Sequence, residues 1–134
     1  MLVVDTSVWI DFLSGHRSPE ADFLAACLAD DVPLVVPGLV CAEVLAGLRT
    51  EAEAVRIGSL LASLDPAPEP TTGDYRVAAA IYRSCRRAGR SVGAMVDCLI
   101  AQICLRNSYT LLTRDSDFIA IAESTGLLLA ARER

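Results

Sequence analysis

The chain has 134 residues, of which 53% are hydrophobic and 5% aromatic, and it carries a formal net charge of −5 at pH 7. This length predicts one domain, residues 1–134, with a core built mainly from aliphatic side chains, and the composition excludes intrinsic disorder. No uncharged apolar run reaches the roughly 18 residues of a membrane span, and the apolar start lacks the basic leader of a signal peptide. We therefore expect a cytoplasmic protein that does not enter a membrane.

The first third of the sequence alternates short apolar runs with helical patterns. An apolar run at residues 2–4 predicts a strand, followed by a helix that begins with Thr6 as its N-cap and stops at Gly15. A serine–proline pair starts a second predicted helix over residues 18–31. Two prolines bound a short predicted strand at residues 33–37. Strand, helix and strand in this order are typical of α/β folds.

The middle of the sequence is mainly helical. A strongly apolar helix is predicted over residues 38–48, in which Glu43 is the only charged residue. A further helix over residues 51–64 leads into a proline-rich connector at residues 65–70, which is too short to separate two domains. An amphipathic helix is predicted over residues 74–88.

The last third contains the most apolar helix of the chain. Residues 93–106 are apolar nearly all round and predict a buried helix, although they include Asp97. Strands are expected at residues 109–113 and 127–129, with a short helix between them. Because each predicted strand is a continuous apolar run and the strands alternate with helices, we expect a parallel sheet covered on both faces.

Four acids occupy places that folding alone does not explain. Asp5 and Asp115 each follow the end of a predicted strand, and open parallel sheets bind ligands beyond the carboxyl ends of their strands. Glu43 and Asp97 are placed in apolar helices, where a buried, unpaired carboxylate costs several kcal/mol. A shared cation is the simpler partner, because the arginines cluster elsewhere and carboxylate oxygens suit Mg²⁺ or Mn²⁺.

Other interpretations fit the same residues. Asp5 and Asp115 also suit helix N-caps, and a buried acid such as Asp97 or Glu43 can be satisfied by backbone N–H groups. We expect Asp11 to be a solvated helix residue. Zinc is not expected, because the chain has one histidine and its five cysteines lack CxxC spacing.

Four segments of the chain resemble the signature regions of the PIN-domain nucleases. They are VVDTS at residues 3–7, AEV at residues 42–44, DCLIA at residues 97–101 and LTRDSDF at residues 112–118. Their order and separations are similar to those of VapC-type toxins of bacterial toxin–antitoxin pairs, and the resemblance covers essentially the whole chain. It implies a PIN-like three-layer α/β/α sandwich around a mostly parallel sheet of four to five strands.

The resemblance also implies a role for each acid. Asp5 and Asp97 match the principal metal ligands, and Glu43 and Asp115 complete the acidic pocket. Asp117 matches an extra acid that some members use for a second metal. Thr6 and Thr113 match family positions whose hydroxyl groups hold ligands or waters.

The implied function is that of a Mg²⁺-dependent endoribonuclease, with Mn²⁺ able to substitute, that acts as the toxin of a toxin–antitoxin pair. RNA is then the substrate, a cognate antitoxin is the protein partner, and a homodimer is expected. The alternatives are a non-catalytic PIN-fold binding module and a PIN nuclease outside toxin–antitoxin systems. Receiver domains and haloacid-dehalogenase-type phosphatases are not expected, because both use a functional lysine and this chain has none.

Four arginines within and just after the helix predicted at residues 74–88 follow an i, i+3, i+4, i+7 spacing. They are Arg83, Arg86, Arg87 and Arg90. Such a stripe can follow an RNA backbone, and a merely solvated helix face explains the same spacing. The net charge does not argue against RNA once four carboxylates are assigned to a metal site.

Overall fold

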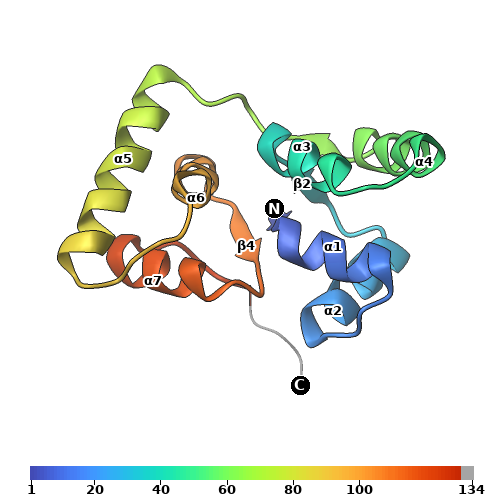
Figure 1. The fold of residues 1–134 in the computed structure, drawn as a ribbon, viewed down its shortest axis with the longest axis horizontal. Coiled ribbons are helices and arrows are strands. Elements are labelled where there is room, and N and C mark those ends of the chain that lie inside the picture. Colours follow the sequence, from blue (N-terminus) through green and yellow to red (C-terminus); the bar gives the residue numbers. More distant parts are fainter. Residues whose placement is uncertain (131–134) are drawn as a thin grey trace.

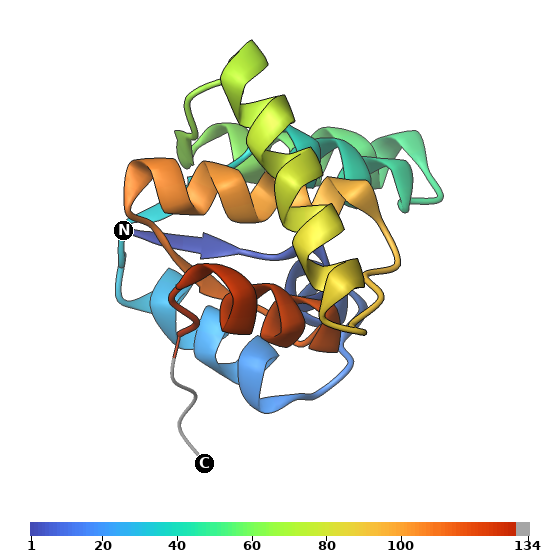
Figure 2. The ribbon, with the colours of Figure 1, turned by 90° about the vertical axis from the view of Figure 1, so that its left-hand side faces the viewer.

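The protein is built in three layers, as its computed structural model, which describes residues 1–130, shows (Figure 1 and Figure 2). The middle layer is a sheet in the order β3-β2-β1-β4, in which every neighbouring pair of strands is parallel. The strands are β1 (Leu2–Val4), β2 (Leu34–Val36), β3 (Asp65–Pro66) and β4 (Thr110–Leu112). The predicted α/β class, with a parallel sheet between helical layers, is confirmed.

Helices cover both faces of this sheet. Those on one face, to the right of the strands in Figure 1, are α1 (Thr6–Ser14), α2 (Pro19–Ala29), α3 (Gly38–Ala46) and α4 (Glu51–Ala62). Those on the other face, nearest the viewer in Figure 2, are α5 (Thr72–Arg87), α6 (Met95–Asn107) and α7 (Ser116–Thr125). Within residues 1–130, no helix combines the length and apolar character needed to cross a membrane.

The strand order reverses at β1. The chain passes from β1 to β2 and β3 on one side, and then returns past β1 to place β4 on the other side. Val4 at the end of β1 lies opposite Leu112 at the end of β4. Open parallel sheets bind ligands at the carboxyl ends of strands where the order reverses. The segments that follow β1 and β4 therefore emerge at the edge where a site is expected.

Local signals explain where several helices begin and end. The hydroxyl group of Ser18 accepts a hydrogen bond from the backbone N–H of Ala21 at the start of α2. Thr71 and Asp74 form a capping box at the start of α5, in which each side chain accepts a bond from the other residue's backbone N–H. α1 ends at Gly15, whose φ of 76° favours glycine.

The core is aliphatic, as the composition predicts. α6 is buried along most of its length, and Ile100, Ala101 and Cys104 have no exposed surface. Trp9 is 1% exposed and packs on the opposite side of the sheet in α1. All five cysteines are free, and four of them are buried, with Cys41 partly exposed. The four buried cysteines are part of the hydrophobic core.

Two predictions for short elements are wrong. The connector at residues 65–70 begins with the edge strand β3. Proline has no backbone N–H, and an edge strand tolerates Pro66 because the side that faces away from the sheet needs no hydrogen-bond donor. Residues 127–129 do not form a strand, and Leu129 makes only an isolated parallel bridge to Leu111. Apolar runs this short do not by themselves show how far the pairing extends.

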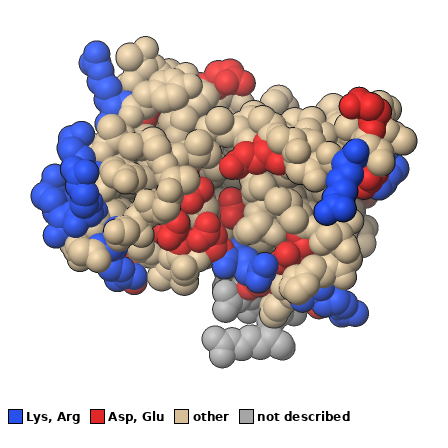
Figure 3. All heavy atoms as spheres, viewed as in Figure 1, with Lys and Arg blue, Asp and Glu red and all other residues tan. Residues whose placement is uncertain are grey.

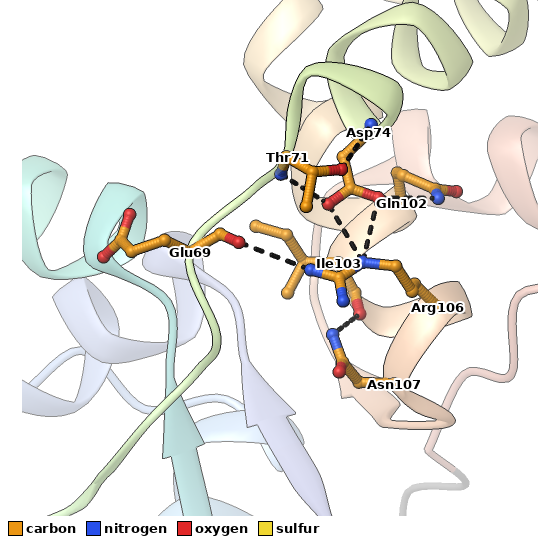
Figure 4. A network of polar contacts seen from close by, with 7 residues as sticks. All are labelled: Glu69, Thr71, Asp74, Gln102, Ile103, Arg106 and Asn107. Atoms are coloured by element: carbon orange, nitrogen blue, oxygen red, sulfur yellow. Dashed lines mark hydrogen bonds and ion pairs between the residues drawn. The ribbon is translucent and has the colours of Figure 1, made fainter.

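A polar network fastens α5 to α6 (Figure 4). Asp74 is 2% exposed, and the Nε of Arg106 lies 2.9 Å from both of its carboxylate oxygens. Gln102 donates to the same carboxylate, and Arg106 also donates to the backbone carbonyl of Glu69. The pKa of Asp74 lies below its ordinary value, mainly because the backbone N–H of Thr71 donates to its carboxylate. The side chains of Gln102 and Arg106 lower this pKa further.

We expect Arg106→Ala to lower the melting temperature by several degrees, because Asp74 then lies buried without its cation. Thermal unfolding followed by circular dichroism measures this change. Arg17→Ala is the matched control, since Arg17 pairs with Asp22 while both side chains are exposed, at 83% and 58%. Equal effects in the two variants would contradict the structural role of the network.

Candidate functional site

Asp5 and Asp115 follow two neighbouring strands. The backbone N–H of Asp5 extends the pairing of β1 with β4 by donating to the carbonyl oxygen of Leu112 at 2.9 Å. Asp5 is the N-cap of α1, so the prediction that Thr6 caps this helix is wrong: the extended backbone continues to Asp5, at φ −68° and ψ 154°. Asp115 is the N-cap of α7. Both acids thus lie where a strand gives way to a helix.

Two hydroxyl groups hold the carboxylate of Asp5. Ser7 Oγ and Thr113 Oγ1 donate to Asp5 Oδ2 at 2.8 and 3.0 Å. The residue is 4% exposed, and burial raises its pKa although these hydrogen bonds act in the opposite direction. Its side chain makes no helix-capping hydrogen bond. A capping role therefore does not account for the acid at this position.

Three further acids approach one another beside Asp5. Asp97 lies in the first turn of α6, and one carboxylate oxygen each of Asp97, Asp115 and Asp117 lies within 4.8 Å of the others. The pKa of Asp97 is raised to about 7, first by burial and then by the negative charges of Asp115, Asp5, Asp117 and Glu43. We call these five residues the acidic cluster.

A chain of hydrogen bonds orders the turn between β4 and α7. Thr113 Oγ1 accepts from the backbone N–H of Asp115 at 3.0 Å, and Asp115 Oδ1 accepts from that of Asp117 at 2.9 Å. Asp117 Oδ2 in turn accepts from the backbone N–H of Gly93 at 3.0 Å. A Cβ atom at Gly93 would lie 3.3 Å from that oxygen, so glycine permits the close approach. This contact joins the loop before α6 to the start of α7.

Glu43 reaches the acidic cluster from α3, on the other face of the sheet. Thr6 Oγ1 donates to Glu43 Oε1 at 2.8 Å. The expectation that Glu43 is buried is wrong, because α3 buries Val40 and Val44 while Glu43 lies on its exposed side. Thr6 and Thr113, predicted to act through their hydroxyl groups, each donate to an acid of the cluster.

The donor set of the acidic cluster fits a hard divalent cation. All five residues offer carboxylate oxygens, the ligands that such ions prefer. Cys98, next to Asp97, is buried in the core, and this burial raises the pKa of its thiol to about 11. Two carboxylates about 4 Å apart repel by roughly 4 kcal/mol at an effective dielectric constant near 20. A bound cation would relieve this repulsion.

Two residues near the cluster could not be assigned from the sequence. Asp11, expected to be solvated, is 6% exposed and forms an ion pair with Arg114, whose Nε lies 2.6 Å from Asp11 Oδ2. Ser7, which lies one helical turn before Asp11 on α1, holds Asp5. The i, i+4 spacing of Ser7 and Asp11 was the available signal, because it places both on one side of the helix.

Acidic and basic side chains form separate concentrations on one face of the molecule, although some basic side chains also lie beside acidic ones. Figure 3 shows acidic side chains gathered in the middle of one face of the molecule and basic ones along the edge where Figure 1 places α5. The predicted arginine stripe is exposed there, at Arg83, Arg86, Arg87 and Arg90. The structure brings the four predicted acids and Asp117 together, while the four arginines of the predicted stripe lie at the edge formed by α5.

Sequence comparison identifies related proteins. A family model described as PIN domain matches residues 2–124. The protein named Ribonuclease VapC11 from Mycobacterium tuberculosis is 30% identical over 132 residues, which cover 98% of each chain.

Solved structures share the fold. The structure of VapBC2 from Rickettsia felis bound to a DNA fragment from their promoter matches with a TM-score of 0.74 at 15% identity, over 98% of both chains. VapBC-1 from nontypeable Haemophilus influenzae matches with a TM-score of 0.72 at 19% identity, over 96% of both chains.

In EDTA, we expect the protein to lose stability as the pH rises from about 4 to about 7. Over this range the folded chain retains the proton on Asp97, which the unfolded chain releases near the ordinary pKa of 3.8. Asp97→Asn removes this titration, so at about pH 8 its melting temperature should exceed that of the unsubstituted chain. Asp30→Asn, an exposed acid outside the acidic cluster, is the control. A parallel pH dependence in all three proteins would contradict the coupling.

Proposed function

This chain belongs to the PIN-domain family of nucleases, and we propose that it hydrolyses RNA phosphodiester bonds at the acidic cluster as a divalent-metal-dependent endoribonuclease. The observation that carries the proposal is the meeting of acids from four separate segments at the edge where the strand order reverses. A bound cation offsets the repulsion among clustered carboxylates. Such a cation can also stabilise the negative charge of a phosphate group during hydrolysis. The relative named Ribonuclease VapC11 supports RNA as the substrate.

Asp5, Asp97, Glu43 and Asp115 would hold Mg²⁺, for which Mn²⁺ would substitute, and Asp117 would contribute to a second metal position. An oxygen-only donor set favours these ions over zinc or copper. When bound, the ion would lower the pKa of a coordinated water and neutralise charge on the scissile phosphate.

The protein's own residues fix and complete this site. Ser7 and Thr113 donate hydrogen bonds to Asp5, so the orientation of its carboxylate is fixed before substrate binds. Glu43 or Asp115 would take the proton from the attacking water as general base, since each has one carboxylate oxygen outside the hydrogen bonds that it receives from Thr6 and from the N–H of Asp117. Thr6 limits the freedom of Glu43 through its hydrogen bond. Hydrolysis would leave a 5′-phosphate and a 3′-hydroxyl.

The biological role we propose is that of the toxin of a toxin–antitoxin pair acting in the cytoplasm. The related solved structures named VapBC and one described as a toxin–antitoxin complex from Klebsiella pneumoniae support this role. An antitoxin with a basic side chain would cover the acidic cluster and block it. A homodimer of the chain is part of the same proposal.

Asp5→Asn and Asp97→Asn are each expected to reduce RNA cleavage by about 10³-fold or more. Both remove a charged ligand from a site whose metal supplies several kcal/mol of transition-state stabilisation. Cleavage of labelled RNA in Mg²⁺, with EDTA as the blank, measures the loss, and circular dichroism checks the fold. Asp30→Asn should keep full activity. Full activity in either cluster variant would refute the assignment of these acids.

Millimolar Mg²⁺ or Mn²⁺ should raise the melting temperature. At a concentration of 100 times Kd, a ligand of the folded state adds about 2.7 kcal/mol to the free energy of unfolding. Thermal scans with added metal, compared with scans at equal ionic strength in NaCl, measure the effect. The shift should shrink in Asp97→Asn and persist in Asp30→Asn. No shift in the unsubstituted chain would count against a metal at the cluster.

A further inference from the structure

A strongly basic surface lies on the outer side of α5. Its arginines, all exposed, are Arg76, Arg83, Arg86, Arg87 and Arg90. The spacing of seven and then four residues from Arg76 to Arg83 and Arg87 places these three on one stripe of the helix. At 1.5 Å per residue this stripe is about 16 Å long. We call these five arginines the α5 basic face.

Most of this positive charge is uncompensated. Within residues 1–130, Arg76, Arg83, Arg86 and Arg87 form no ion pair with a carboxylate. The acid of α5 itself, Asp74, is buried in the network with Arg106 and adds no charge to the face. A chain with a net charge of −5 thus collects unpaired cations on one helix.

Aromatic rings lie beside these arginines. Tyr75 is 56% exposed, and Tyr82 lies two turns further along α5, so the two rings share a stripe next to the arginines. The guanidinium group of Arg86 lies 5.9 Å from the ring centre of Tyr82. Unstacked bases pack on aromatic rings and on guanidinium planes. Cations together with accessible rings favour a nucleic-acid strand over a purely acidic protein surface.

The α5 basic face is connected to the acidic cluster. After α5 ends, Arg90 forms an ion pair with Glu123 of α7, and the backbone N–H of Gly93 then binds Asp117. Figure 3 shows the basic edge and the acidic centre on the same face of the molecule. Without a bound metal the acidic cluster repels phosphate groups, so cations outside it add to the attraction that holds an RNA strand.

We propose that the α5 basic face binds the phosphate backbone of the RNA substrate and leads the strand to the acidic cluster. This inference rests on the proposed function, since it names the surface that delivers RNA to that site. Each arginine that neutralises a phosphate releases counterions, so the face also sets how strongly salt weakens binding.

The test compares the salt dependence of RNA binding in two triple variants. Arg83→Gln with Arg86→Gln and Arg87→Gln removes three cations from the α5 basic face and keeps good helix formers. The matched control removes three exposed arginines elsewhere, Arg17, Arg49 and Arg56, also by replacement with glutamine. All proteins carry Asp97→Asn to prevent cleavage, and fluorescence anisotropy follows a labelled RNA hairpin in Mg²⁺ between about 50 and 200 mM salt.

The slope of log affinity against log salt should become flatter by about 2 to 3 in the α5 triple variant, at roughly 0.7–0.9 per lost phosphate contact. The control should keep the slope of the parent. An unchanged slope in the folded α5 variant overturns the inference, and so does an equal change in both triple variants. If the triple variant does not fold, Arg83→Gln and Arg87→Gln singly should each flatten the slope by about 0.7–0.9.

Failure of the proposed function is recognised separately. Cleavage of the same hairpin in Mg²⁺ is measured with the chain that retains Asp97. This measurement does not depend on whether the α5 basic face binds RNA. Cleavage with an unchanged slope in the α5 triple variant refutes the surface and leaves the nuclease. Absence of cleavage refutes the nuclease.

Discussion

Repulsion among carboxylates is the constraint on which this structure depends. A parallel sheet whose strand order reverses at β1 brings Asp5 and Asp115 to one edge, and α6 adds Asp97 to the same place. Burial, together with the negative charges of the neighbouring acids, raises the pKa of Asp97 to about 7 and opposes its ionisation. The aliphatic core and the hydroxyl groups of Ser7 and Thr113 hold the acids there nonetheless. In the proposed function, a divalent cation would turn this unfavourable arrangement into a binding site.

The distribution of charge follows from the same constraint. In the proposed function, positive charge around the acidic cluster would attract an RNA backbone, in addition to the metal bound there. Arginine carries this charge, since the protein contains no lysine. Some arginines serve the fold, as Arg106 does with Asp74 and Arg114 with Asp11. The arginines of α5 have no such partner among residues 1–130, which is why net charge is a poor guide to the partners of this chain.

Much of the site could be predicted because its signals are local. Asp5 and Asp115 follow apolar strands, and Glu43 and Asp97 interrupt apolar helices, so each acid is conspicuous in its own segment. The remaining features depend on contacts between distant segments. The bond from Gly93 to Asp117, the pair of Asp11 with Arg114 and the pairing of β3 leave no mark on local periodicity. The exposure of Glu43 was mispredicted for a related reason, since a short apolar helix packs only one side and its composition does not show which.

Anomalous diffraction from crystals grown with Mn²⁺ would show directly whether these acids bind a divalent cation. We expect an anomalous peak bounded by the carboxylates of Asp5, Asp97 and Asp115, with oxygen ligands and no cysteine sulfur among them. A well-ordered acidic cluster without such a peak, in crystals grown at millimolar Mn²⁺, would contradict this expectation.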